Sequence, residues 1–169
     1  MRAWFLSVLV LISLTASAFA EEWDSFKEFV YKPGKVALKL PGRPEVEKKT
    51  VDTATGKRTI TIVSSKGPGM NEQFLLMYFD GTVKGDRADV FDDMEKSFVS
   101  AGSTVQSRKD TKMLGYPTRA LRVAAGPQIA ELRIIIAPRR TYVILGAVDA
   151  RGAHLFPFTA YFNSLRLTK

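Results

Sequence analysis

A single histidine and no cysteine limit the chemistry open to this 169-residue chain. Ser-His-Asp and Cys-His catalysis both need a positioned base, and zinc sites built from cysteine and histidine need several such ligands. No partner motif flanks His154, which falls at the start of a predicted helix, where a capping or surface position is expected. The sequence therefore predicts no catalytic residue, no metal site and no cofactor.

The acidic segment DGTVKGDRADVFDD, residues 80–93, matches a calcium-binding loop poorly. Asp80 and Gly85 fit positions 1 and 6 of an EF-hand loop, but threonine, lysine and phenylalanine occupy positions 3, 5 and 12. We expect these acids to cap a helix and to lie on its solvent-exposed face, because negative charge near the first turn is favourable.

Strand-like segments also carry glutamates that could serve a hydrolase. They are Glu45, Glu47, Glu72 and Glu131. Glycoside hydrolysis uses two facing carboxyl groups about 5–10 Å apart, and nothing in the sequence singles out such a pair. The chain is therefore predicted not to be an enzyme, and a carboxylate-based hydrolase of cell-envelope polymers is the alternative.

Arginines recur on neighbouring predicted strands and in the turn that joins two of them. They are Arg119, Arg122, Arg133, Arg139 and Arg140. Within one meander, Arg119 and Arg133 could share a polar face. Because guanidinium groups bind carboxylates and phosphates well, we predict an anion-contact surface at Arg119, Arg133, Arg139 and Arg140. A solvated sheet face with Glu131 as counter-charge is the simpler interpretation.

Residues 1–20 have the pattern of a secretory signal peptide. Arg2 gives a positive start, residues 4–14 are almost wholly apolar, and Ala18 and Ala20 form the small-x-small pattern of a cleavage site. The apolar run is shorter than the roughly 20 residues that span a bilayer, so a membrane anchor is less favoured. We expect cleavage after Ala20, a secreted or periplasmic protein, and no transmembrane segment in the mature chain.

The net charge is +8, and removal of Arg2 with the signal leaves +7. An excess of lysine and arginine favours anionic partners such as phospholipid head groups or acidic cell-wall polymers, although solubility alone can explain it. The charges are spread along the chain, and export makes nucleic acid an unexpected target. The predicted partner is an unknown protein or an anionic envelope component.

The segment AELRIIIAPRRTYVILGAV, residues 130–148, raises the choice between a membrane helix and a hairpin. A spanning helix would bury Arg139 and Arg140 at about 2.5–3.5 kcal/mol each. A hairpin with Pro138 in its turn leaves both in water. Alternation predicts this hairpin, and similar patterns predict further strands over residues 35–40, 46–65 (two strands), 73–80, 103–110 and 116–126.

Two helices are predicted. Residues 86–102 have an amphipathic stripe, with Asp86 or Asp89 as N-cap and Gly102 as the C′ residue. Residues 154–169 are predicted to form a closing helix with Pro157 in its first turn. Its expected buried stripe is Phe158, Tyr161, Phe162 and Leu165. Residues 23–31 remain open between a helix and one strand of a hairpin.

These elements predict an α+β fold, in which a largely antiparallel sheet carries helices on its faces as an αβα sandwich. The predicted organisation is a signal peptide over 1–20, an N-terminal segment over 21–34 and a single α+β domain over 35–169.

The chain also resembles a known family in a few segments. These are VALKLPGRP near the mature start, the helix after LLMYFD, the ELRIIIAPRRTYVILGAV hairpin and the terminal AYFNSLRL. Together they resemble the PsbP-like domains and their exported bacterial relatives of unknown role. The resemblance implies an αβα sandwich and a non-catalytic binding or accessory role, and it transfers no metal ligand or docking residue.

Overall fold

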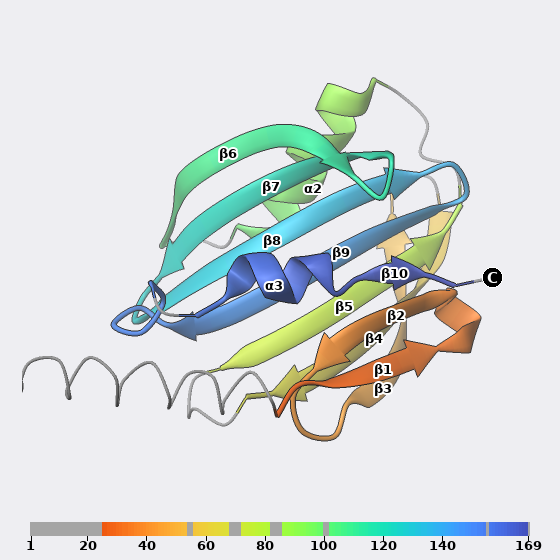
Figure 1. Ribbon diagram of the computed structural model, residues 1–169. Helices are drawn as coiled ribbons and strands as arrows, with labels where there is room; N and C mark the ends of the chain where they lie inside the picture. Colours follow the sequence, from red (N-terminus) through yellow and green to blue (C-terminus); the bar gives the residue numbers. More distant parts are fainter. Residues whose placement is uncertain are drawn as a thin grey trace, which may run out of the picture.

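Two antiparallel sheets dominate the molecule (Figure 1). The computed structural model describes residues 25–53, 56–67, 72–81, 86–99, 102–154 and 156–168. The large sheet contains, in spatial order, β3 (Glu45–Thr53), β4 (Gly56–Lys66), β5 (Gln73–Asp80), β9 (Arg140–Asp149), β8 (Gln128–Ala137), β7 (Tyr116–Ala125) and β6 (Ser103–Met113). The small sheet contains β1 (Lys27–Tyr31), β2 (Val36–Leu40) and β10 (Arg166–Leu167). The helices are η1 (Lys32–Gly34), α2 (Arg87–Phe98) and α3 (Phe158–Asn163).

The predicted hairpin at residues 130–148 is confirmed. β8 and β9 are antiparallel, and Ala137 lies opposite Arg140 across the turn that contains Pro138. Both strands lie inside the large sheet, flanked by β7 and β5. Their apolar residues are buried on both faces of the sheet, Ile135 and Ile144 in one core cluster and Ile134 and Val143 in the other. No helix in the described part of the chain is long and apolar enough to cross a membrane.

One face of the large sheet packs against the small sheet and α3. The core between them is aromatic: the ring centroids of Phe74 and Phe26 are 5.0 Å apart, and those of Phe74 and Tyr161 are 5.2 Å apart. Edge-to-face contacts of this kind are favourable beyond the area they bury. Tyr161 is fully buried, and its hydroxyl donates a hydrogen bond to the carbonyl of Leu145 at 3.2 Å. This core fixes α3 over the sheet.

Helix α2 covers part of the opposite face, as its amphipathic pattern predicted. Phe91 is buried against Leu121 and other residues of the sheet. The Asp86 carboxylate caps the helix by accepting a hydrogen bond from the Ala88 amide at 2.7 Å. The helix ends at Phe98, so the predicted role of Gly102 as C′ residue is wrong, because Gly102 directly precedes β6.

The predicted αβα sandwich is wrong. The described part of the chain is mostly β-sheet, and α2 is the one long helix within it. A second sheet supplies most of the cover that helices were expected to provide. The predicted closing helix is only six residues long, because the chain after Asn163 extends to pair Arg166 with Ala37 of β2.

The sequence is compatible with a helix or a hairpin strand over residues 23–31, and Lys27–Tyr31 form a hairpin strand. β1 pairs with β2 from Lys27–Leu40 to Tyr31–Val36. Residues 27–31 therefore pair with β2, and η1 forms the turn between these two strands. The hairpin turn uses Lys35 at a positive φ of 50°.

Candidate functional site

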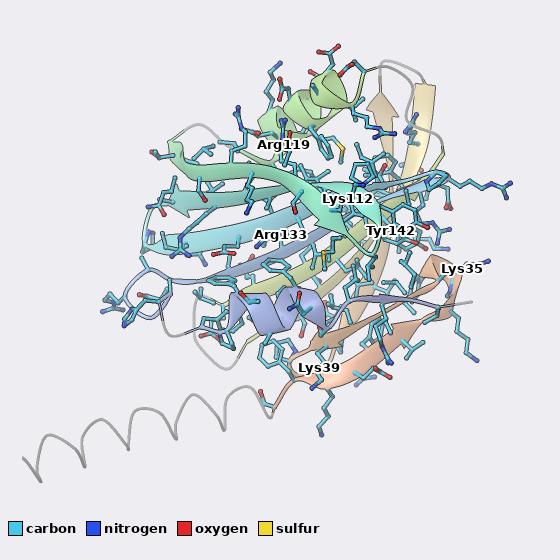
Figure 2. The ribbon with its side chains drawn as sticks, turned by 45° about the horizontal axis from the view of Figure 1, so that its top comes forward. Lys35, Lys39, Lys112, Arg119, Arg133 and Tyr142 are labelled. Atoms are coloured by element: carbon cyan, nitrogen blue, oxygen red, sulfur yellow. The ribbon has the colours of Figure 1, made fainter. Side chains whose placement is uncertain are left out.

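The structure separates the arginines that were predicted to form one anion-contact surface. Residues directly opposite on adjacent strands share a face, and Arg119 lies opposite Ile134, which packs on the α2 side. Arg133, one position away along β8, lies on the other face, between the sheet and α3 (Figure 2). The prediction that Arg119 and Arg133 share a face is therefore wrong. Arg139 is exposed in the β8–β9 turn, and Arg140 begins β9.

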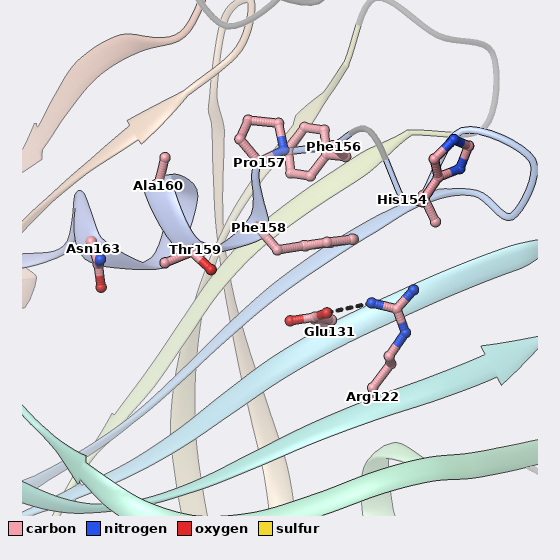
Figure 3. A pocket seen from close by; sticks show the side chains of 10 residues that line it. Arg122, Glu131, His154, Phe156, Pro157, Phe158, Thr159, Ala160 and Asn163 are labelled. Carbon is pink, nitrogen blue, oxygen red and sulfur yellow. Dashed lines mark hydrogen bonds and ion pairs between the residues drawn. The ribbon is translucent and has the colours of Figure 1, made fainter.

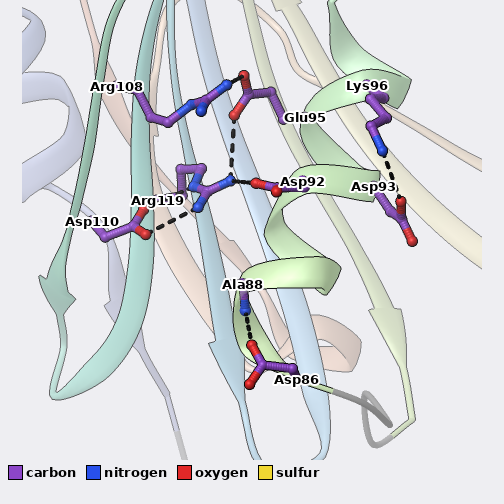
Figure 4. A network of polar contacts seen from close by, with 9 residues as sticks. All are labelled: Asp86, Ala88, Asp92, Asp93, Glu95, Lys96, Arg108, Asp110 and Arg119. Carbon is purple, nitrogen blue, oxygen red and sulfur yellow. Dashed lines mark hydrogen bonds and ion pairs between the residues drawn. The ribbon is translucent and has the colours of Figure 1, made fainter.

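Arg119, which is buried, is the centre of a charge network on the α2 side (Figure 4). We call it the Arg119 cluster; its members are Arg119, Arg108, Asp92, Glu95 and Asp110. Arg119 is 5% exposed and makes a bidentate pair with Asp110, at 2.8 Å from Nε and 3.0 Å from Nη2. It also pairs with Asp92, and with Glu95 at 3.4 Å.

Charge pairing in this cluster shifts the titration of its members. Hydrogen bonds from Arg119 lower the pKa of Asp92 and of Asp110 from their ordinary values. In return, the hydrogen bond to Asp110 raises the pKa of Arg119. All these groups pair with one another across α2, β6 and β7, so the cluster attaches the helix to the sheet and presents little unbalanced positive charge.

Arg140 also has a structural role. Its guanidinium pairs with Asp80, donates to the carbonyl of Pro33 at 3.2 Å and lies 4.5 Å from the ring centroid of Tyr78. Tyr142 adds a hydrogen bond from its hydroxyl to the carbonyl of Gly34 at 3.2 Å. These contacts connect the large sheet to η1. The positive charge of Arg140 is balanced by the carboxylate of Asp80.

A second charge group lies on the α3 side. We call it the groove triad: Arg122, Glu131 and Arg133. The Glu131 carboxylate accepts from Arg122 Nη1 at 2.7 Å through Oε1 and from Arg133 Nη2 at 3.2 Å through Oε2. Arg133 lies 4.2 Å from the ring centroid of Phe162, a cation–π geometry. Burial lowers the pKa of Arg133, and Glu131 opposes that shift.

A groove of about 560 Å³ opens beside this triad, between α3 and the face of β7 and β8 (Figure 3). Arg122 and Glu131 line one side. The other side comes from the segment before α3 and from the helix itself: Ala153, His154, Phe156, Pro157, Phe158, Thr159, Ala160 and Asn163. The size is typical of small-molecule sites, which combine apolar walls with a few placed polar groups.

A second, smaller cavity of about 410 Å³ lies at the end of β4 and β5, and Glu45 is the carboxylate that lines it. Within the described ranges, no cluster of three or more acidic, histidine or cysteine side chains could hold a metal ion. Asp80 and Asp86 of the acidic segment pair with Arg140 and cap α2, respectively. Ala18 and Ala20, the predicted cleavage positions, lie outside the described residues.

His154, predicted as a capping or surface residue, is exposed at the mouth of the groove. It lies in a turn four residues before α3 and does not cap that helix, whose N-cap is Pro157. The sequence had singled out Arg122 and Glu131 only as members of a charged strand face. It missed the groove wall formed by Phe158, Thr159 and Asn163, because no local signal shows which strands the short helix covers.

Comparison of the sequence with models of protein families and with curated proteins finds no match. The resemblance to PsbP-like domains therefore stays a prediction.

Proposed function

We propose that this chain is an exported, non-catalytic binding protein whose ligand site is the groove between α3 and strands β7 and β8. The observation that carries the proposal is the composition of this groove. It combines an apolar wall, including Phe156 and Phe158, with a half-buried Arg122–Glu131 pair and the exposed polar residues His154 and Asn163. Such a mixture supports binding and orientation of a small ligand.

Binding is favoured over the hydrolase alternative by the distribution of carboxylates. A glycosidase needs two facing carboxyl groups. Each of the two cavities described above is lined by one, Glu131 in the groove and Glu45 in the smaller cavity. Glu131 uses both oxygens to bind arginine side chains, an arrangement that suits a structural counter-charge better than a nucleophile.

The groove can be tested by recording amide NMR spectra of the mature chain against a panel of small acids, amines, sugars and neutral aromatics. If the groove binds ligands, at least one class shifts signals of the α3 segment, including Asn163, and Thr159→Ala, a change at an exposed residue of the groove wall, weakens that response. Leu114→Ala provides the matched control, since Leu114 is an exposed apolar residue in the β6–β7 turn. A panel that shifts nothing near α3, or an equal loss in both variants, would contradict the proposal.

A second candidate function, association with anionic membrane surfaces, is favoured by the small sheet. Val30 is 47% exposed on its outer face. The small sheet and its turn carry several exposed cations: Lys27, Lys32, Lys35, Lys39 and Arg166. Glu28, which pairs with Arg166, is the acid among them on β1. Lysines beside an exposed apolar side chain are the composition that favours anionic lipid head groups.

Vesicle sedimentation distinguishes this candidate. Vesicles with phosphatidylglycerol should retain the mature chain at low salt and release it as salt rises, whereas phosphatidylcholine vesicles should not retain it. The Lys32→Glu/Lys39→Glu variant should lose binding. The matched variant Lys109→Glu/Lys112→Glu, which changes the same charge on β6, should keep most of it. Equal losses would show that net charge alone, and not the small sheet, drives adsorption.

A further inference from the structure

We propose that the groove beside α3 selects a small organic acid, an apolar body carrying a single carboxylate, and that Arg122 holds the carboxylate. This inference deepens the proposed binding function and rests on it. Three features of the groove support it: the charge balance of the groove triad, the fixed orientation of Arg122, and the apolar wall beside it.

The charge balance of the groove triad is positive. Glu131 is engaged through both carboxylate oxygens, one with each arginine. Two guanidinium groups therefore share one carboxylate, which leaves an excess of one positive charge at a partly buried position. The Glu131 side chain is 14% exposed and that of Arg133 is 21% exposed, so this excess is screened less than a surface charge would be. A ligand with a single negative charge would balance it.

Arg122 is the member of the triad that can reach such a ligand, because it lines the groove. Its Nη1 donates to Glu131, and its Nε donates to the side-chain oxygen of Gln106 at 3.3 Å. Gln106 sits at an irregularity in the β6–β7 pairing, between Val105 and Ser107, and a bulge of this kind redirects a side chain. These contacts hold the guanidinium plane and leave Nη2 as the donor for a ligand, so little side-chain entropy is lost on binding.

The wall opposite Arg122 is apolar and aromatic. The central guanidinium carbon of Arg122 lies 6.0 Å from the ring centroid of Phe158, and the ring centroids of Phe156 and Phe158 are 4.8 Å apart. A body such as a phenyl ring or short acyl chain would cover this wall while its carboxylate faces Arg122. Asn163 and Thr159, both exposed on α3, offer neutral hydrogen-bonding groups at the rim.

Isothermal titration of the mature chain with benzoate, benzamide and phenyl phosphate tests the inference. A carboxylate hydrogen-bonded to a guanidinium should make benzoate bind roughly ten- to hundredfold more tightly than benzamide. Phenyl phosphate, which carries up to two negative charges, should bind less tightly than benzoate. Equal affinity for benzoate and benzamide, or tighter binding of phenyl phosphate, would overturn the assignment of the ligand class.

Two variants with opposite expected effects protect the test against simple misfolding. Arg122→Gln should remove the preference for benzoate over benzamide. Glu131→Gln should increase the affinity for benzoate, since it removes the competing carboxylate. Arg151→Gln, at a side chain that is 91% exposed, is the matched control and should change neither affinity. A Glu131→Gln protein that binds benzoate more weakly than the wild type would contradict the charge argument.

The outcomes also separate this inference from the proposed function. If benzamide and benzoate bind equally and both shift α3 signals in NMR spectra, the selectivity for acids is overturned. The groove would then still be a binding site. No binding of these probes, or of any class in the wider panel, would overturn both.

Discussion

Replacing Arg119 by methionine should destabilise the protein strongly, because it removes the centre of the Arg119 cluster. Methionine keeps a long apolar side chain over Phe91, whose ring centroid lies 5.0 Å from the guanidinium carbon. Glu95, 6% exposed, would keep only its Arg108 partner within the cluster. Removing one partner of a buried ion pair costs about 3–5 kcal/mol. Asp92 and Asp110 are about half exposed and can regain water, so we expect a loss of about 2–4 kcal/mol.

Urea unfolding followed by far-UV circular dichroism measures this loss, which corresponds to a fall in Tm of roughly 5–15 °C for a domain of this size. Arg151→Met is the matched control. It removes an ion pair with Asp149 at 3.0 Å from a fully solvated side chain, so the free energy of unfolding should change by less than about 0.5 kcal/mol. A loss in Arg119→Met below about 1 kcal/mol would place the cluster among ordinary surface pairs and refute the reasoning.

The acid limb of stability gives an independent readout of the same cluster. Arg119 lowers the pKa of Asp92 and of Asp110 in the folded state. A carboxyl with a depressed folded pKa contributes stability above its unfolded pKa, about 3.9, and this contribution is lost as the pH falls through the folded pKa. The wild type should therefore lose stability steeply below about pH 4, and Arg119→Met should show a shallower fall. Parallel pH profiles would contradict the assignment.

Three further substitutions probe the rest of the fold. Gly34→Ala should lower the free energy of unfolding by about 1–3 kcal/mol, because the new Cβ would lie 2.9 Å from Cε1 of the buried Tyr78; an unchanged urea midpoint would contradict this. Tyr161→Phe should cost about 1 kcal/mol through its lost hydrogen bond to Leu145. Burial raises the pKa of Tyr161 in the folded state. The free energy of unfolding of the wild type should therefore fall as the pH rises above about 10, and that of Tyr161→Phe should fall less. Identical decreases in both proteins would refute this expectation. His154→Ala, at an exposed turn, should change stability by less than about 0.5 kcal/mol, and a larger loss would reveal a structural contact.

Most strands could be predicted from the sequence because their signals are local. Alternation of apolar residues identifies a strand, and a turn residue such as Pro138 identifies the hairpin. The N-cap of α2 was equally local, since the Asp86 carboxylate bonds to an amide two residues away. Each of these features depends on neighbours within a few positions, so no tertiary information was needed.

The C-terminal segment could not be predicted in the same way. Phe158, Tyr161 and Phe162 are all buried as the helical stripe indicated, but the helix ends where distant backbone groups become available. The Ser164 hydroxyl accepts a hydrogen bond from the Lys39 amide at 3.1 Å, and Arg166 pairs with Ala37. These partners are more than a hundred positions away in sequence. The same non-local pairing explains why the αβα expectation was wrong. Arg166 and Leu167 join β2 in a second sheet, which covers the face where a longer helix was expected.

The candidate site was predictable in part. β7 and β8 are joined by a two-residue turn that includes Gly126, and Ala125 lies opposite Gln128. Counting back from that turn places Arg122 opposite Glu131, as observed. The sequence therefore contained the pairing of these two residues. It did not contain the position of α3 above them, which depends on aromatic packing between distant segments.

The two faces of the large sheet differ in how they balance charge, and this difference localises the expected ligand. In the Arg119 cluster, three carboxylates surround two arginines, and every member is bound to another. In the groove triad, one carboxylate serves two arginines. Electrostatic attraction of an anion needs uncompensated positive charge near a cavity that excludes part of the solvent. Of these two charge groups, only the groove triad meets both conditions, so an anion should contact the α3 side even though the deepest buried arginine lies on the other face.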